Sequence, residues 1–189
     1  MSVKKIQIIK RSVILEGLRP LMFDRYSGDN KKELQSEQKM YLNSKMELIF
    51  PAVNILSFLC AENTKSAVKF FYDKREYKDV AQAILGFVSI DPGEMLITRD
   101  GKTPIVFSGF RDDEITLHNS VARLPKGIPN PKKRPLLHLP WQIGFQITLF
   151  ENAKIDEEGL RNLFEQGGLM IGLGTFRGVF GKFKVKSWN

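Results

Sequence analysis

The amino-acid sequence predicts a mixed α+β domain. A segment rich in Ile and Val at 3–16 and a strongly apolar segment at 141–150 are typical of strands. Apolar residues recur at helical spacing within 51–62 and 157–169. Apolar and basic residues alternate over 180–188, which predicts a half-buried final strand. The 189 residues are enough for one large domain, or for two small ones that share a sheet.

A loop follows the first strand. In residues 19–30 a proline, a glycine and an Asp-Asn pair interrupt the apolar pattern. The segment carries Arg19, Arg25 and Tyr26, whose side chains suit a phosphate and a stacked base. The alternative is an ordinary polar connection between two elements.

Helical segments are expected next. Residues 31–46 favour a weakly amphipathic helix, and Pro51 suits the first residue of a second one. The spacing of apolar residues after Pro51 makes Cys60 a small buried hydrophobe rather than a nucleophile. A short helical segment over 64–71 follows.

The second half of the chain reads mainly as strands. Residues 85–110 predict three short strands separated by turns at Asp91-Pro92-Gly93 and Asp100-Gly101. Another strand is expected over 113–124, and the prolines and charges of 125–135 predict irregular structure. Asp156 then caps a helix, for which we expect a buried stripe made of Leu160, Leu163, Phe164 and Leu169.

The formal net charge of +8 favours a polyanionic partner, most often nucleic acid. No apolar run approaches the roughly 20 residues that cross a bilayer, and Lys10-Arg11 interrupt the first apolar stretch, so we expect a cytoplasmic protein with no membrane partner. One cysteine and two isolated histidines, His118 and His138, predict neither a disulfide, nor a metal site, nor a cofactor.

The glycine-rich stretch at 167–188 does not fit a nucleotide-cofactor loop. Gly172 and Gly174 would need a glycine at position 177, where Arg177 stands. A helix leads into this stretch and a strand leads out, which is the reverse of a dinucleotide site. A P-loop at residues 101–103 is excluded because Leu96 occupies a required glycine position.

Two interpretations of this stretch remain. Glycines let backbone N–H groups face a ligand, and here Arg177 and Lys182 would add charge while Phe176 and Phe180 pack beneath or stack. Alternatively, the glycines allow a tight crossing from helix to strand. Both can hold together.

The sequence offers single candidate catalytic residues but no set of residues arranged for catalysis. Asp24 and Asp29 lie in the first loop, where aspartates are commonly turn residues. The sequence shows no nucleophile elbow and no paired His and carboxylate. Enzymatic activity is therefore the less favoured interpretation.

The order of elements resembles the RAMP superfamily of RNA-binding proteins, which includes backbone subunits of CRISPR effector complexes. IGLGTFRGVFGKFKV at 171–185 is similar to the family's glycine-rich loop, and IFPAVNILSFLCAE at 49–62 is similar to its transition from strand to first helix, without the Gly-Ser-Ser that often follows the proline. The segments RPLMFDRY and LGTFRGVFGKF also resemble a group commonly encoded by phages.

The resemblance implies one RAMP-like domain over 1–189, with a ferredoxin-like (RRM-like) antiparallel sheet, helices on one face and an inserted β-hairpin. That insert, at about 111–139, would be a protruding thumb with PKKRP at its tip. In some relatives an aspartate after the first strand cleaves RNA, which makes Asp24 and Asp29 weak catalytic candidates. The histidine of the RNA-processing branch has no match here.

The predicted function is binding of single-stranded nucleic acid, with RNA favoured over DNA. The chain would act as one copy in an antiviral ribonucleoprotein assembly, by self-association or with other subunits. The alternatives are a phage-type single-stranded-DNA-binding or recombination accessory protein, a metal-independent endoribonuclease, and a structural protein that meets an acidic partner chain. The expected nucleic-acid-binding residues are Arg19, Arg25, Tyr26, Lys132, Lys133, Arg134, Gly172, Gly174, Phe176, Arg177, Gly178, Lys182 and Lys184.

Overall fold

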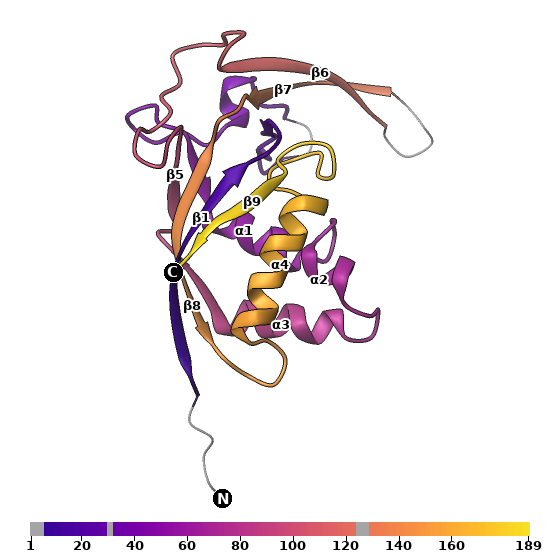
Figure 1. Cartoon of the computed structure of the whole chain (residues 1–189). Helices are drawn as coiled ribbons and strands as arrows, with labels where there is room; N and C mark the ends of the chain where they lie inside the picture. Colours follow the sequence, from indigo (N-terminus) through magenta and orange to yellow (C-terminus); the bar gives the residue numbers. More distant parts are fainter. Residues whose placement is uncertain (1–5, 30–31, 124–128) are drawn as a thin grey trace, which may run out of the picture.

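A computed structural model describes residues 6–29, 32–123 and 129–189, which form two sheets and a layer of helices (Figure 1). The larger sheet has the strand order β3-β5-β8-β1-β9, and β4 pairs with the other end of β8. Its strands are β1 (Ile8–Gly17), β3 (Ile49–Pro51), β4 (Val88–Asp91), β5 (Glu94–Thr98), β8 (Gln142–Phe150) and β9 (Phe183–Trp188).

The larger sheet has ferredoxin-like topology. Strand β1 lies in the centre and pairs antiparallel with β8 on one side and with β9 on the other. Strands β4 and β5 together take the place of the second ferredoxin strand, since each pairs antiparallel with a different part of β8. The spatial order β9, β1, β8, β4/β5 confirms the predicted fold class.

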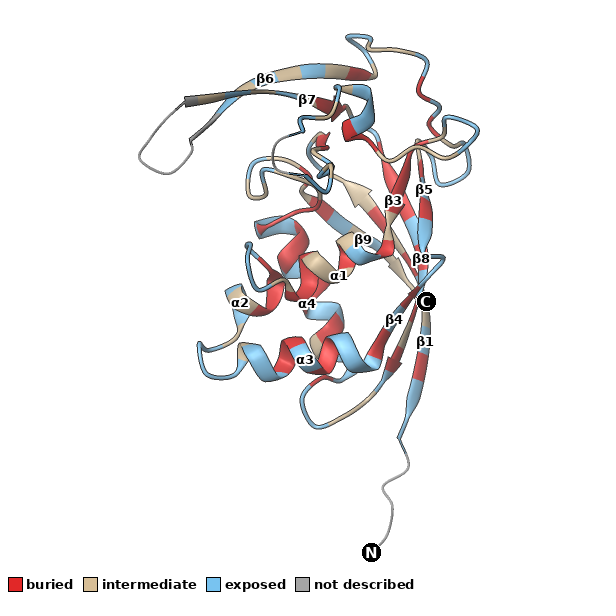
Figure 2. Cartoon of the chain, turned by 180° about the vertical axis from the view of Figure 1, so that it is seen from behind, coloured by how far each residue is buried: buried red, intermediate tan, exposed pale blue. Residues whose placement is uncertain are grey.

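Four helices cover one face of this sheet (Figure 2): α1 (Ala52–Cys60), α2 (Ala67–Phe71), α3 (Tyr77–Phe87) and α4 (Glu157–Met170). Phe58 of α1 packs against Phe164 of α4 and Phe183 of β9, with ring centroids 5.9 and 5.3 Å apart. Along β1, Val13 and Leu15 are buried toward the helices whereas Lys10 and Ser12 are exposed on the other face. The period of two therefore sets which face of the sheet meets the core.

The predictions for α1 and α4 can be compared with the structure residue by residue. The Asp156 carboxylate accepts a hydrogen bond from the Gly159 amide at 2.8 Å, which confirms the predicted helix cap. Cys60 is buried, as expected, and burial raises the pKa of its thiol to about 11. The expected stripe on α4 is wrong at Leu169, which is 46% exposed.

The smaller sheet projects beyond the main body (Figure 1). It has the order β2-β7-β6, with β2 (Leu21–Met22), β6 (Ile115–Arg123) and β7 (Pro129–Leu137). Strands β6 and β7 form a long antiparallel hairpin in which His118 stands opposite Arg134. Figure 2 shows the same hairpin reaching outward above the helical layer.

The prediction of irregular structure over 125–135 is wrong from Pro129 onward. Prolines 131 and 135 share one parity along β7, so their backbone groups point away from β6. The Pro135 carbonyl accordingly accepts a hydrogen bond from the Phe23 amide on the opposite edge. Because the missing N–H groups fall on this mostly open edge, the strand keeps its pairing with β6. Residues 124–128 lie outside the described part of the chain.

Three further predictions differ from the structure. Residues 32–46 form a loop with one 3-10 turn, η1 (Glu37–Lys39), instead of a helix. Helix α3 occupies Tyr77–Phe87, so the strand expected at 85 begins only at Val88. Pro104 and Val106 make isolated bridges rather than a third strand. Among the described residues no helix is long and apolar enough to cross a membrane.

Candidate nucleic-acid interface

The glycine loop (residues 171–182) joins α4 to β9, and its glycines allow contacts within the chain. Gly172 has φ +83°, and a Cβ there would lie 2.7 Å from the Gly181 carbonyl carbon. A Cβ on Gly174 would overlap the Met22 carbonyl oxygen, and one on Gly181 would overlap that of Leu173. The interpretation as a tight crossing from helix to strand is thus supported by the packing.

Most amides of the glycine loop donate to carbonyl groups of this chain. The Thr175 amide donates to Met22 at 3.0 Å, and the Gly181 amide donates to Pro20 at 2.8 Å. Within the loop, Leu173 donates to Gly181 and Gly178 donates to Ile171. The expected cradle of loop amides around a phosphate therefore needs correction, because these donors already have partners.

Arg177 points into the protein and ties the glycine loop to the end of α1. Its guanidinium donates to the Ser57 carbonyl at 3.2 Å, the Ser57 hydroxyl at 3.1 Å and the Lys65 carbonyl at 2.7 Å. Burial lowers the pKa of Arg177 below its ordinary value. The side chain lines a small hollow together with Asp24, Asn54 and Thr175, but most of its donors are used within the chain.

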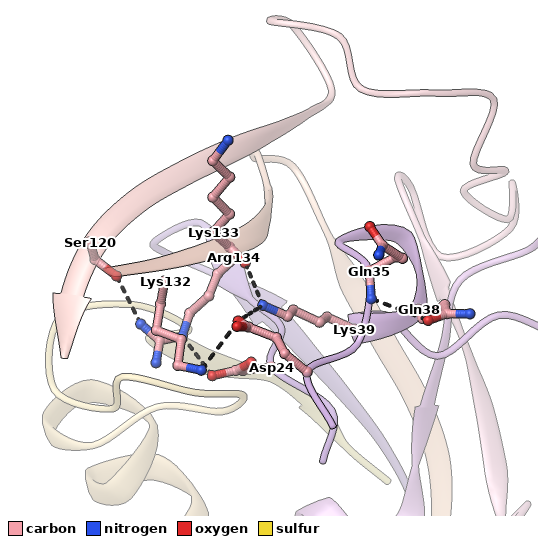
Figure 3. A network of polar contacts seen from close by, with 9 residues as sticks. Asp24, Gln35, Gln38, Lys39, Ser120, Lys132, Lys133 and Arg134 are labelled. Carbon is pink, nitrogen blue, oxygen red and sulfur yellow. Dashed lines mark hydrogen bonds and ion pairs between the residues drawn. The ribbon is translucent and has the colours of Figure 1, made fainter. Parts of the chain in front are cut away.

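Asp24 holds Arg134 where the first loop meets the hairpin (Figure 3). The Arg134 Nε donates to Asp24 Oδ2 at 2.7 Å, and another nitrogen donates to the Ser120 hydroxyl at 2.8 Å. Both side chains are mostly buried, with 13% of Arg134 and 24% of Asp24 exposed. This pair accounts for the position of Asp24 without any catalytic role.

A second polar cluster lies beside the first. Lys39 is buried, and its ammonium group donates to Glu33 and to the Lys133 carbonyl, each at 2.9 Å. Lys132 reaches the same Glu33 carboxylate at 3.2 Å. Hydrogen bonds from Lys39 and Lys132 hold the pKa of Glu33 below its usual range. The cluster fixes the loop over 33–39 against β7.

Three adjoining hollows lie along the contact between the first loop and the hairpin. We call these three hollows together the loop–hairpin groove. The two hollows that touch β7 have volumes of about 560 and 420 Å³. Arg25 lies over the Tyr41 ring, 5.4 Å from its centre. The cationic, aromatic and amide side chains that line the groove are Arg25, Tyr26, Lys32, Gln35, Gln38, Lys39, Asn119, Asn130, Lys132 and Lys133.

Lys133 differs from its neighbours on β7. Its side chain points away from the polar clusters in Figure 3, is exposed, and makes no ion pair within the described residues. Arg25 and Tyr26 are also exposed at the other side of the groove. The structure thus brings the predicted residues Arg25 and Tyr26 together with Lys132 in one hollow, and it places Lys133 at the adjoining hollow.

Other predicted residues lie elsewhere. Arg19 is exposed before β2, and its carbonyl accepts the Trp141 indole N–H at 2.9 Å. Lys184 pairs with Glu16 at 2.8 Å on the open face of the main sheet. Lys182 precedes β9, and Asp29 lines the groove beside Tyr26.

Sequence reasoning missed Lys32, Glu33, Lys39 and Asn119. The first three fall in the segment predicted as a helix, where charged residues are expected on the solvent-exposed face of that helix. Only the contact with β7 gives them a place in the groove. Within the described residues no group of three or more His, Cys, Asp or Glu side chains is arranged to hold a metal ion.

Comparison with known proteins bears on the fold. No protein-family model matches the chain, and no curated protein matches it. Among solved structures it is similar to a chain in the structure described as Type III-B Cmr-beta bound to cognate target RNA, with a TM-score of 0.52 and 12% identity. The match covers 96% of this chain and 60% of the other, so this chain spans less than two thirds of that protein's length.

Proposed function

We propose that this chain binds single-stranded nucleic acid, RNA in preference to DNA, along the loop–hairpin groove. The observation that carries the proposal is that Arg25 and Tyr26 line one hollow of the groove together with Lys132, while Lys133 lines the adjoining hollow. Cations held along a groove bind a phosphate backbone, and an exposed tyrosine offers a face on which a base stacks. The net charge of +8 favours the same class of ligand.

The groove suits a single strand better than a duplex. Its cations come from a loop and a hairpin that face each other, and two of them, Lys39 and Lys132, pair with Glu33. Base stacking requires exposed base faces, which a single strand presents and a duplex hides. Contacts with the phosphates themselves carry no sequence preference.

The chain would act as one of several copies in a cytoplasmic ribonucleoprotein assembly, such as the backbone of a CRISPR effector complex. The projecting hairpin would then be the thumb by which one copy reaches its neighbour and the bound strand. Support comes from the ferredoxin-like sheet of this chain and from its structural similarity to a chain in the structure described as Type III-B Cmr-beta bound to cognate target RNA. A single module grips few nucleotides, and repetition along a strand gains affinity.

The ligand class is tested by fluorescence anisotropy with labelled oligouridine, oligodeoxythymidine and an RNA duplex. We expect tight binding of the single strands at low salt, with RNA bound more tightly than DNA, and a steep loss of affinity as salt rises. Absence of binding to all three oligonucleotides at low salt would overturn the proposal. Stronger binding of DNA would favour the alternative of a single-stranded-DNA-binding accessory protein.

A further inference from the structure

Phe176 has a backbone conformation that is unfavourable for any residue with a Cβ. Its backbone has φ +56°, in the left-handed region that costs a residue with a Cβ about 1–2 kcal/mol. Its side chain is 53% exposed, so burial of the ring offsets little of that cost. The other residues of the glycine loop with positive φ, at 172, 174, 178 and 181, are all glycine. A phenylalanine here therefore calls for an explanation other than folding.

Phe176 is the outermost of three neighbouring rings. Phe180 lies 5.9 Å from Phe176, with the ring planes tilted by 44°. On its other side Phe180 meets His118 of β6 edge-on, with ring centres 5.3 Å apart. The three rings form an aromatic row that runs from the hairpin to the exposed tip of the glycine loop. Figure 1 shows that loop beneath the hairpin.

Basic residues flank the aromatic row. His118 stands opposite Arg134 in the hairpin, so both project from the same face, as does Lys132 two residues away. The Lys65 ammonium lies at the other end, 3.6 Å from the point where a Cβ on Gly178 would stand. An exposed aromatic ring between cationic groups matches a ligand that carries both negative charge and flat apolar faces.

We infer that the aromatic row is a base-stacking platform, on which Phe176 takes one nucleobase of a single strand. The inference rests on the proposed function and adds a second contact to it, outside the residues that line the loop–hairpin groove. The groove holds phosphates, whereas the row holds a base face. The strain at Phe176 then serves to present the ring to a ligand instead of to the core.

The test compares two ligands and two variants. The ligands are labelled oligouridine and the same oligonucleotide with abasic sites, which keeps the phosphates but has no base to stack. The variants are Phe176→Gly, which relieves the backbone strain, and Val179→Ala, a matched control that removes another exposed apolar side chain of the loop, 52% exposed. Thermal unfolding of each variant is recorded in parallel.

We expect Phe176→Gly to unfold at or above the wild-type temperature because glycine adopts positive φ without strain. Its affinity for oligouridine should fall by roughly tenfold, within the range of one lost base stack. Its affinity for the abasic strand should match that of the wild type, and Val179→Ala should bind both as the wild type does. Phe176→Tyr should restore much of the binding to oligouridine.

Three results would overturn the inference. The first is equal affinity of wild type and Phe176→Gly for oligouridine. The second is an equal loss for oligouridine and the abasic strand. The third is weaker self-association of Phe176→Gly in sedimentation without nucleic acid and unchanged RNA binding, which would make the row a protein contact. Failure of the proposed function is distinguishable, because the wild type would then bind neither strand.

Discussion

Among the glycines of the glycine loop, Gly181 leaves the least room for a side chain. It has φ +69°, it is buried, and a Cβ at this position would overlap the carbonyl oxygen of Leu173. Gly178 has φ +94° but faces only the flexible end of Lys65. A substitution at Gly178 therefore tests the cost of backbone conformation alone, whereas one at Gly181 adds the cost of steric overlap.

We therefore expect Gly181→Ala to lower the free energy of unfolding by about 3 kcal/mol or more, the sum of left-handed strain and overpacking. Gly178→Ala should lower it by about 1–2 kcal/mol, from strain alone. Urea denaturation followed by circular dichroism measures both. Equal losses for the two variants would show that packing does not require a glycine at 181.

Residue types alone predicted which side chains are chemically suited to a nucleic acid, but not which of them are available. Arg177 was singled out because it stands within the glycine-rich stretch, and its guanidinium turns out to bind Ser57 and Lys65. Asp24 was a catalytic candidate and is held by Arg134. Partners that lie about 110 residues away in the sequence leave no local pattern that would reveal them.

At the scale of elements, Arg177 joins the glycine loop to the end of α1. Arg177→Ala removes three hydrogen bonds to Ser57 and Lys65, two of them to carbonyl groups, and should lower the free energy of unfolding by about 1–3 kcal/mol. We expect its binding to oligouridine to keep the wild-type dependence on salt, because these donors face the protein.

The control for this prediction is Arg161→Ala on the exposed side of α4. Arg161 makes one surface pair with Glu165, which contributes less than about 1 kcal/mol. Stability and salt dependence are measured together for both variants by thermal unfolding and anisotropy. A shallower salt dependence of Arg177→Ala with unchanged stability would show that Arg177 contacts phosphate after all.

Elements with strong local patterns were predicted well, and those that depend on distant contacts were not. Strand β8 follows from its strongly apolar sequence, and the cap of α4 follows from Asp156. The prolines of β7 predicted irregular structure, but the segment forms a strand because it pairs with β6 and its opposite edge is mostly open. The loop over 32–46 is shaped by the burial of Lys39 against β7, which no periodicity indicates.

At the scale of the whole molecule, the ferredoxin-like body holds the first loop and the hairpin in fixed positions. Both extend from the central part of the sheet: the first loop follows β1, and the hairpin leads into β8. Cationic residues from segments about 100 residues apart in the sequence thus line one groove. The sequence predicted Arg25, Lys132 and Lys133 as candidates, and folding places them along the groove together with Lys32 and Lys39.

In the proposed function, the loop–hairpin groove binds the phosphate backbone. The most direct test is the slope of log affinity for oligouridine against log salt concentration in a charge-matched pair of double variants. Arg25→Ala/Lys133→Ala removes two exposed cations of the groove, and Lys10→Ala/Lys74→Ala removes two exposed cations elsewhere. Each phosphate contact with a single strand contributes about 0.7 to this slope.

We expect a slope shallower by about 1.4 for the groove variant, and a wild-type slope for the variant that retains the groove. Equal slopes for the two variants would contradict this expectation, because the phosphates would then be held somewhere other than in the loop–hairpin groove.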